Sequence, residues 1–225
     1  MTIDSEADSP VFFFDCDNCL YSKDLGVLQL MRQKIVEYFV RMGMEENEAK
    51  ELRARYHMDY GLALRGLQKH HEVDPIQYDK EVDGSLPLDD IMKPDPVLRE
   101  MLAGLKMKKW IFTNAYYPHA WRCVKLLGID DQFDGMVCMT FADYRVPDFV
   151  CKPEIEAYKK AMEEAGVKDP SLCYLVDDSA ANVDAAKSLG WTSIHVTDDL
   201  DGPKHGDYQI TTIHDLAKVL PHLWQ

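Results

Sequence analysis

Phe12-Phe13-Phe14-Asp15-Cys16-Asp17-Asn18-Cys19-Leu20-Tyr21 is the stretch that decides the fold, because bulky apolar residues run directly into two acids one residue apart. The apolar run predicts a strand buried on both faces. Ligands of open α/β sheets bind at the carboxyl ends of the strands, where Asp15 and Asp17 stand. Two acids this close repel each other unless a cation or a shared proton offsets them. The spacing therefore favours a magnesium-assisted nucleophile beside an acid/base partner.

Three later segments favour this interpretation over a solvated acidic turn. Residues 110–114 form a second apolar strand that ends in small polar groups, and residues 172–179 form a third that ends in acids. Residues 151–153 place one cation just before a helix that begins with proline. Taken singly, the cation would be a surface lysine and the acids a helix cap. The polar side chains contributed by these segments are Thr113, Asn114, Lys152, Asp177 and Asp178.

In this order the segments resemble the motifs of the haloacid dehalogenase superfamily, and the whole chain is similar to its phosphatase branch. The resemblance implies that Asp15 is the nucleophile that becomes an aspartyl phosphate and that Asp17 is the general acid/base. It also implies that Thr113 hydrogen-bonds the phosphoryl group and that Lys152 neutralises Asp15 and the phosphate. The implied ligands of Mg²⁺ are Asp15, the backbone carbonyl of Asp17, Asp178 and Asp177.

These residue types suit phosphoryl transfer, which needs positioning and charge stabilisation. Magnesium prefers oxygen ligands, and Lys152 offsets the repulsion between several carboxylates and a phosphate dianion. Within the superfamily, an acid at Asp17 favours phosphate-ester hydrolysis or phosphomutase chemistry over dehalogenase or phosphonatase chemistry. Asn182, where many relatives carry an acid, is expected to orient ligands rather than bind the metal.

Alternation of helix and strand predicts the fold class, an α/β, doubly wound parallel sheet of the Rossmann-like kind. The predicted strands after the first cover residues 109–112, 135–139, 172–176 and 192–196. The predicted core helices cover residues 95–106, 117–127, 153–165, 180–189 and 213–220. Residues 198–207 hold acids and turn residues, so we expect a loop there.

A helical insert separates the first strand from the first core helix. Apolar residues recur at helical spacing over residues 27–39, and helix formers follow over 45–56. Further helices are expected over 60–67 and 78–82. We therefore expect a core domain of residues 10–21 and 94–225 and a helical cap of residues 22–93. Such a cap would admit substrate and then exclude water.

Four motifs resemble the fungal and plant pyrimidine 5′-nucleotidase-type phosphatases across nearly the whole chain. They are Asp-Cys-Asp-Asn-Cys-Leu-Tyr (15–21), Tyr-Gly-Leu-Ala-Leu-Arg-Gly-Leu (60–67), Ser-Leu-Pro-Leu (85–88) and Phe-Thr-Asn-Ala (112–115). The resemblance implies hydrolysis of pyrimidine nucleoside monophosphates such as UMP and CMP. Pyridoxal phosphate, lysophosphatidate and phosphoglycolate are alternative substrates. A phosphomutase is an alternative activity, and a phosphate-binding regulator is disfavoured because binding alone requires no nucleophile.

Some side chains are candidates for substrate choice. The candidate substrate-binding residues are Asn114, Arg65, Tyr60 and Arg145. Arg65 is costly to bury without an anion, so it either reaches the substrate or pairs with an acid such as Asp59 or Glu72. Tyr60 and Tyr21 either stack on a base or pack in the core.

Composition narrows the class of protein. The 225 residues, 46% of them hydrophobic, suffice for one core plus an insert. A net charge of −14 argues against nucleic-acid polymers but allows a small anion in a local pocket. There is no long apolar segment, so neither a membrane span nor a secretory signal is expected. Six cysteines without paired spacing suit a reducing compartment, the cytoplasm or the nucleus.

The spacing of the cysteines and histidines in the sequence does not predict a further metal site. Cys16 and Cys19 form a single Cys-x-x-Cys, which we interpret as packing rather than as a redox or zinc motif. No histidines stand at zinc-ligand spacing. His119 and Arg122 either border the mouth of the site or lie on a solvated helix face, and the solvated face is the expectation. We expect a monomer or a weak homodimer.

Overall fold

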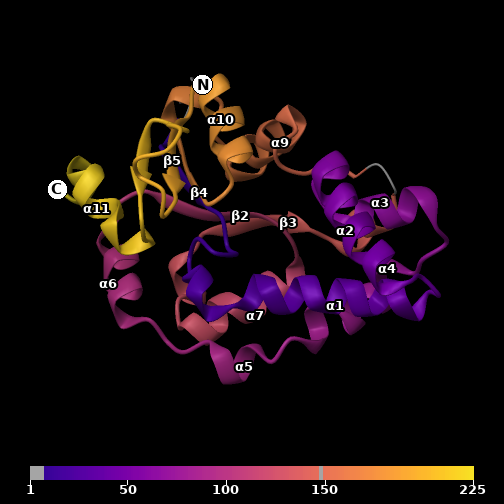
Figure 1. The fold of residues 1–225 in the computed structure, drawn as a ribbon. Coiled ribbons are helices and arrows are strands. Elements are labelled where there is room, and N and C mark those ends of the chain that lie inside the picture. The colour runs from indigo at the N-terminus through magenta and orange to yellow at the C-terminus, as the bar shows by residue number, and fades with distance from the viewer. Residues whose placement is uncertain (1–7, 147–148) are drawn as a thin grey trace.

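A six-stranded parallel sheet forms the centre of the computed structural model, which describes residues 8–146 and 149–225. The strand order is β3-β2-β1-β4-β5-β6, so the order reverses between β1 and β4. This confirms the predicted α/β parallel sheet (Figure 1). The strands are β1 (Val11–Phe14), β2 (Lys108–Tyr116), β3 (Gly135–Met139), β4 (Cys173–Asp177), β5 (Thr192–Val196) and β6 (Tyr208–Ile210).

Both faces of β1 are buried, as its apolar run predicts. Phe12 and Phe14 pack with side chains of α6 (Pro96–Gly104) and α7 (Tyr117–Leu127) on one face. Val11 and Phe13 pack with α9 (Ile155–Ala165) and α10 (Ala180–Ser188) on the other. Each buried phenylalanine contributes about 1.5–3 kcal/mol of transfer free energy. This packing fixes the end of β1, and with it the position of the residues that follow.

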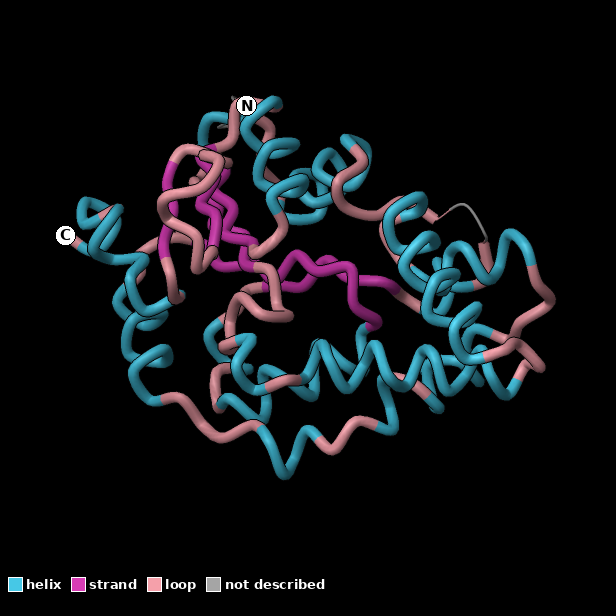
Figure 2. The backbone as a smooth tube through the Cα atoms, viewed as in Figure 1, coloured by secondary structure: helices cyan, strands magenta, loops and turns pink. Residues whose placement is uncertain are grey.

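Four of the five α-helices between β1 and α6 share an apolar cluster separate from the main one. They are α1 (Val27–Arg41), α2 (Glu46–Tyr60), α3 (Ala63–His70) and α4 (Pro75–Glu81). Figures 1 and 2 show α2, α3 and α4 together at one end of the molecule, with the long α1 leading to them. Phe149 and Cys151, from the segment before α9, join the same cluster. The helical insert therefore packs against the segment that carries Lys152.

Local chemistry moves two helices of this insert from their predicted positions. Gly61, with φ of 78°, ends α2 after Tyr60, so the predicted helix over 60–67 is wrong at its start and α3 begins at Ala63. Asp74 accepts a hydrogen bond from Ile76 N, and the following proline occupies the first turn. This cap begins α4 three residues before the predicted start at 78.

Short elements account for the remaining differences. The sequence did not predict α5 (Leu88–Ile91), α8 (Phe141–Tyr144) or β6. The predicted helix over 213–220 is reduced to α11 (Leu216–Val219) between two 3-10 turns, Ile213–Asp215 and Pro221–Trp224. The other 3-10 turns are Lys23–Leu25, Asp83–Ser85, Asp130–Gln132 and Pro170–Leu172. Across residues 8–146 and 149–225, no helix combines the length and apolarity needed to span a membrane.

Candidate active site

Strands β1, β2 and β4 bring their carboxyl-terminal residues to one edge of the sheet. Phe14 pairs with Ile111 of β2 and with Val176 of β4. The backbone N–H of Asp15 donates to Val176 O at 3.0 Å. The residues that follow each strand are therefore neighbours at the point where the strand order reverses, which is where open α/β sheets bind ligands.

Lys152 is the cation at this edge, and its side chain is completely buried. Its Nζ donates to Asp15 Oδ1 at 2.9 Å, to Asp177 Oδ2 at 2.6 Å and to Phe112 O at 2.5 Å. Burial lowers the pKa of Lys152, but Asp15 and Asp177 raise it overall above its usual value. The lysine is thus a permanent positive charge, compensated by two carboxylates and a carbonyl.

Asp15 is buried against these groups. Burial raises the pKa of Asp15 well above its usual value, Lys152 opposes this shift, and Asp177 and Asp178 add to it. Because Asp177 and Asp178 lie close by, the ionised form of Asp15 needs a nearby cation such as Lys152 to stabilise it.

Asp177 has its carboxylate fully engaged. Its Oδ1 accepts hydrogen bonds from Ser179 N at 2.9 Å and Asn182 Nδ2 at 3.0 Å. Its Oδ2 accepts from Asn182 Nδ2 at 3.0 Å and from Lys152 Nζ. Asp177 therefore holds the lysine in place, and Asn182 orients Asp177.

Asp178 differs because the side chain that donates to it makes only a long hydrogen bond. Asn18 Nδ2 donates to Asp178 Oδ2 at 3.3 Å. Burial raises the pKa of Asp178 to about 7, with Asp177 adding to the shift. Oxygen atoms of Asp15, Asp177 and Asp178 lie within 4.8 Å of one another. This oxygen donor set fits a hard divalent cation such as Mg²⁺, and Asp178 has more free capacity than Asp177.

A cavity of about 700 Å³ reaches Asp178 and Asn18. It is lined mainly by residues 18–25, 93–96, 196–198 and 211–214. Asp178 therefore lines this cavity and is accessible through it.

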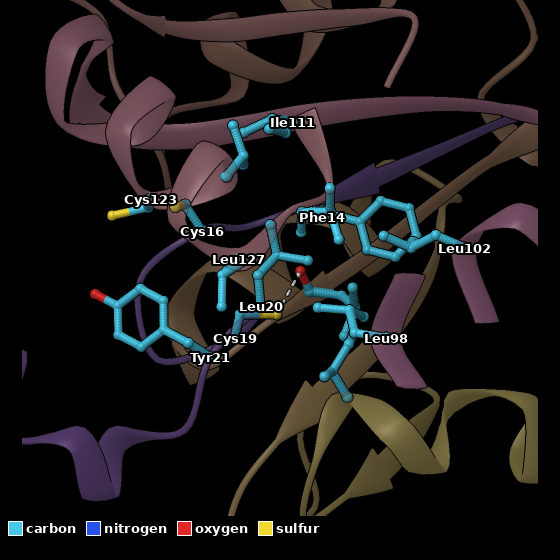
Figure 3. Packing of buried hydrophobic residues seen from close by; sticks show 14 of the residues in the cluster. Phe14, Cys16, Cys19, Leu20, Tyr21, Leu98, Leu102, Ile111, Cys123 and Leu127 are labelled. Atoms are coloured by element: carbon cyan, nitrogen blue, oxygen red, sulfur yellow. Dashed lines mark hydrogen bonds between the residues drawn. The ribbon is translucent and has the colours of Figure 1, made fainter. Parts of the chain in front are cut away.

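Asp17 is held by two donors on the same oxygen. Its Oδ1 accepts from the Tyr21 hydroxyl at 2.5 Å and contacts His119 Nε2 at 2.8 Å. Tyr21 also lies in the main apolar cluster, as Figure 3 shows. The expectation that His119 lies on a solvated helix face is wrong, because His119 is 4% exposed.

The sequence contained a sign of this role for His119. Along α7, the buried positions are His119, Ala120, Cys123, Val124 and Leu127. Their spacing is that of one helical face, so a histidine stands on the apolar stripe. A polar residue there needs a buried partner, and Asp17 is that partner. Arg122, by contrast, lies at a partly solvated position, where it donates to Leu86 O and pairs with the exposed Asp89.

Thr113 and Asn114 lie where β2 reaches the site. Thr113 is buried, and its Oγ1 accepts from Ala115 N at 3.1 Å. The Asn114 amide is engaged with the backbone of Lys152: Nδ2 donates to the Lys152 carbonyl at 2.8 Å, and Oδ1 accepts from Lys152 N at 2.9 Å. Asn114 thus positions the segment that carries the lysine.

The two candidates in the insert, Arg65 and Tyr60, have partners that the sequence did not indicate. Arg65 forms an ion pair with Glu154, two positions after Lys152, rather than with Asp59 or Glu72. Its Nε is buried and has no hydrogen-bond partner in the described chain. Tyr60 makes a hydrogen bond with His70 at 2.7 Å. Arg145 is exposed just after α8.

Comparison with known proteins agrees with this arrangement. A family model described as haloacid dehalogenase-like hydrolase matches residues 10–190. The chain therefore belongs to the haloacid dehalogenase-like hydrolase family, and the superfamily resemblance is confirmed.

Individual relatives are similar over most of the chain. Phosphate metabolism protein 8 of Saccharomyces cerevisiae is 41% identical over 202 residues, 84% of this chain but 62% of the yeast protein, so the chain spans less than two thirds of that relative. Glyceraldehyde 3-phosphate phosphatase of Pyrococcus furiosus is 24% identical and covers 93% of this chain and 92% of its own. A crystal structure of a HAD phosphatase from Thermococcus onnurineus shares the fold, with a TM-score of 0.61, 21% identity, and 94% and 97% of the two chains covered.

Proposed function

We propose that the protein is a magnesium-dependent phosphomonoesterase that acts through an aspartyl phosphate on Asp15. The observation that carries the proposal is the contact of 2.9 Å between Asp15 and the buried Lys152, with Asp17 held nearby by His119. A binding protein needs a cation for phosphate, but it needs neither a buried carboxylate nucleophile nor a second acid oriented by two donors. The relatives named as phosphatases support the same class.

In the first step, an oxygen of Asp15 attacks phosphorus and the bond from phosphorus to the ester oxygen breaks. Asp17 donates a proton to that leaving oxygen. Before this step, the hydrogen bond between Asp17 and His119 keeps this proton shared by the two residues. Lys152 and Thr113 stabilise the charge on the phosphoryl oxygens. When bound, Mg²⁺ supplies further charge neutralisation, and Asp15, Asp178 and the Asp17 carbonyl are its proposed ligands.

In the second step, water attacks the aspartyl phosphate. Asp17 accepts a proton from the water, the acyl phosphate bond breaks, and Asp15 returns to its carboxylate form. Asp177 remains with Lys152 and Asn182 throughout, because both its oxygens are engaged there. We therefore place it behind the ligands rather than among them.

We infer that the substrate is a pyrimidine nucleoside monophosphate, UMP or CMP. The motifs over 15–21 and 60–67 support this choice, and residues 22–93 would act as the cap that selects it. The buried Nε of Arg65, which lacks an acceptor in the described chain, supports a contact between Arg65 and the substrate. Tyr60 and Arg145 are further candidates for this selection. Other small phosphomonoesters are the alternative substrates.

Phosphate release from a panel of esters tests the proposal. The panel holds UMP, CMP, AMP, GMP, pyridoxal phosphate, phosphoglycolate and lysophosphatidate, each with Mg²⁺ or EDTA. We expect turnover with UMP and CMP that needs Mg²⁺ and falls by at least about a thousandfold in Asp15→Asn. Turnover of another ester alone would keep the mechanism and reject the substrate. Absence of any turnover would reject the phosphatase, and added sugar bisphosphate would then test for a mutase.

A further inference from the structure

Two buried thiols lie beside the proposed acid/base residue. Cys16 stands between Asp15 and Asp17 in the loop after β1, and Cys123 lies one helical turn after His119 on α7. Both cysteines are 0% exposed. Their sulfur atoms and a carboxylate oxygen of Asp17 lie within 4.8 Å of one another. Figure 3 shows the two side chains next to each other, from the loop and from the helix.

His119 adds a fourth donor to this group. Its Nε2 lies 2.8 Å from Asp17 Oδ1 and 3.5 Å from Cys123 Sγ. Two sulfurs, one imidazole nitrogen and one carboxylate oxygen therefore converge from two segments of the chain. Cys19 is not part of the group, because its Sγ donates to Val176 O at 3.5 Å. Cys16 therefore lies in this group with Cys123, which is distant in sequence, and not with Cys19 of the Cys-x-x-Cys segment.

These separations suit a tetrahedral cation. With bonds of about 2.3 Å to sulfur and about 2.0–2.1 Å to nitrogen or oxygen, the ligand atoms of a tetrahedral zinc lie about 3.3–3.8 Å apart. The 3.5 Å from His119 Nε2 to Cys123 Sγ lies in this range, the 2.8 Å from His119 Nε2 to Asp17 Oδ1 is shorter, and the ligand atoms of Cys16, Asp17 and Cys123 lie within 4.8 Å of one another. Thiolate and imidazole ligands select zinc-like metals, whereas Mg²⁺ prefers oxygen.

We propose that Cys16, Asp17, His119 and Cys123 form a second cation site, selective for a thiophilic divalent metal such as Zn²⁺ and distinct from the carboxylates of Asp15 and Asp178. Binding releases one proton from each thiol and forms two metal–sulfur bonds. The entry is past Asp17, whose side chain is 26% exposed, since the thiols are buried.

Occupancy of this site inhibits hydrolysis, a consequence that rests on the proposed function. The cation takes Asp17 Oδ1 and His119 Nε2, so Asp17 loses the oxygen through which His119 orients it. An excess of Mg²⁺ does not relieve this inhibition, because the two metals occupy different ligands. If Zn²⁺ instead inhibited by replacing Mg²⁺ at the carboxylates, an excess of Mg²⁺ would relieve the inhibition.

Absorption by a metal–thiolate complex tests the site without reference to activity. The full chain is titrated with Co²⁺ in excess Mg²⁺ and without competing thiols, and the ultraviolet charge-transfer band is recorded. We expect one equivalent of Co²⁺ to give the band and Zn²⁺ to displace it. In Cys123→Ser the band is expected to fall by half or more and affinity to fall at least about tenfold. Cys138→Ser, which alters a buried free cysteine on β3 outside the group, should match the unaltered protein.

Two results would overturn the proposal. One is the lack of a thiolate band in the unaltered protein, and the other is an undiminished band in Cys123→Ser. A circular dichroism melt of each variant establishes folding, and Cys123→Ala replaces a serine variant that fails to fold. Zn²⁺ inhibition at saturating Mg²⁺ then tests the consequence: equal inhibition of Cys123→Ser and the unaltered protein would reject it. A protein with no phosphatase activity would still give the absorption result.

Discussion

His119 on α7 and Asp17 after β1 are 102 positions apart, yet Nε2 and Oδ1 lie 2.8 Å from each other. Burial on its own raises the pKa of Asp17, but the charge of His119 and hydrogen bonds from His119 and Tyr21 lower it overall. Burial lowers the pKa of His119, whereas Asp17 raises it well above its usual value. The two residues thus hold one proton between them, which rests on His119 in the free protein, and Asp17 must take this proton before it can donate it to a leaving oxygen.

Removing His119 should affect esters according to their leaving groups. With His119→Ala, we expect turnover of UMP to fall about a hundredfold, because the alkoxide needs a proton from a well-oriented Asp17. Turnover of p-nitrophenyl phosphate should fall less than about tenfold, since p-nitrophenolate leaves with little help. His119→Gln, which retains a donor, should recover part of the loss.

Steady-state kinetics on both esters measure this difference, with His222→Ala at an exposed position as the control. An equal loss for both esters would mean that His119 supports the fold rather than Asp17. A thermal melt of His119→Ala separates a lower folded fraction from a slower step.

Lys152→Met should destabilise the fold by about 3–5 kcal/mol, because two buried carboxylates lose their shared cation. Urea unfolding measures the change. Adding Asp177→Asn to the same chain should restore part of the stability, since one unpaired charge is then removed. Lys160→Met, at a 42% exposed side chain, should change stability by less than about 0.5 kcal/mol. A loss below about 1 kcal/mol for Lys152→Met would contradict the proposed neutralising role.

Asp83 gives the protein a pH dependence of stability. Burial raises the pKa of Asp83 to about 6, with His119 opposing and Asp79 and Asp17 adding. The folded protein therefore binds this proton more tightly than the unfolded chain, so the free energy of unfolding falls as pH rises from about 4 to about 6. Asp83→Asn never ionises and should be more stable by about 1–3 kcal/mol at pH 8.

Near pH 4 the Asp83→Asn variant and the unaltered protein should have similar free energies of unfolding. Urea unfolding at both pH values gives the comparison, and Asp90→Asn, at an exposed acid, is the control. A difference of the same size at pH 4 and pH 8 would show that packing, not ionisation, causes it.

Arg65→Lys should raise KM for UMP about tenfold while kcat changes less than about twofold, because the charge stays but the Nε donor is lost. Glu154→Gln, which removes the partner of Arg65, should raise KM less than about threefold. Kinetics of both variants decide between two roles. If the two changes have the same effect, Arg65 acts only through its ion pair with Glu154.

The fold was predictable because its pattern is local. The apolar run of β1 and the helix-strand alternation after it depend on side chains near in sequence. Short elements such as β6 and α8 were missed because three or four residues carry no clear period. The start of α3 was missed because the break at Gly61 depends on one backbone angle, not on apolar spacing.

The site was predictable in its members and not in their contacts. The motifs brought Asp15, Lys152 and Asp178 together, since Asp15 and Asp178 follow strand ends and Lys152 precedes a core helix. They did not separate the tasks of Asp177 and Asp178, because this separation comes from hydrogen bonds with Asn182 and Asn18. These contacts arise from tertiary packing. Two neighbouring aspartates look alike in the sequence, so the sequence does not indicate which one makes which contact.

The cavity beside Asp178 is bounded without helices α1 to α4. Its lining comes from core loops such as 196–198 and 211–214 and from residues 22–25 and 93 at the two ends of the insert, and among the described residues none from these four helices contributes. Under the proposed function, an ion entering through this cavity would reach Asp178 without displacing any of those helices, so it could exchange while they stay packed.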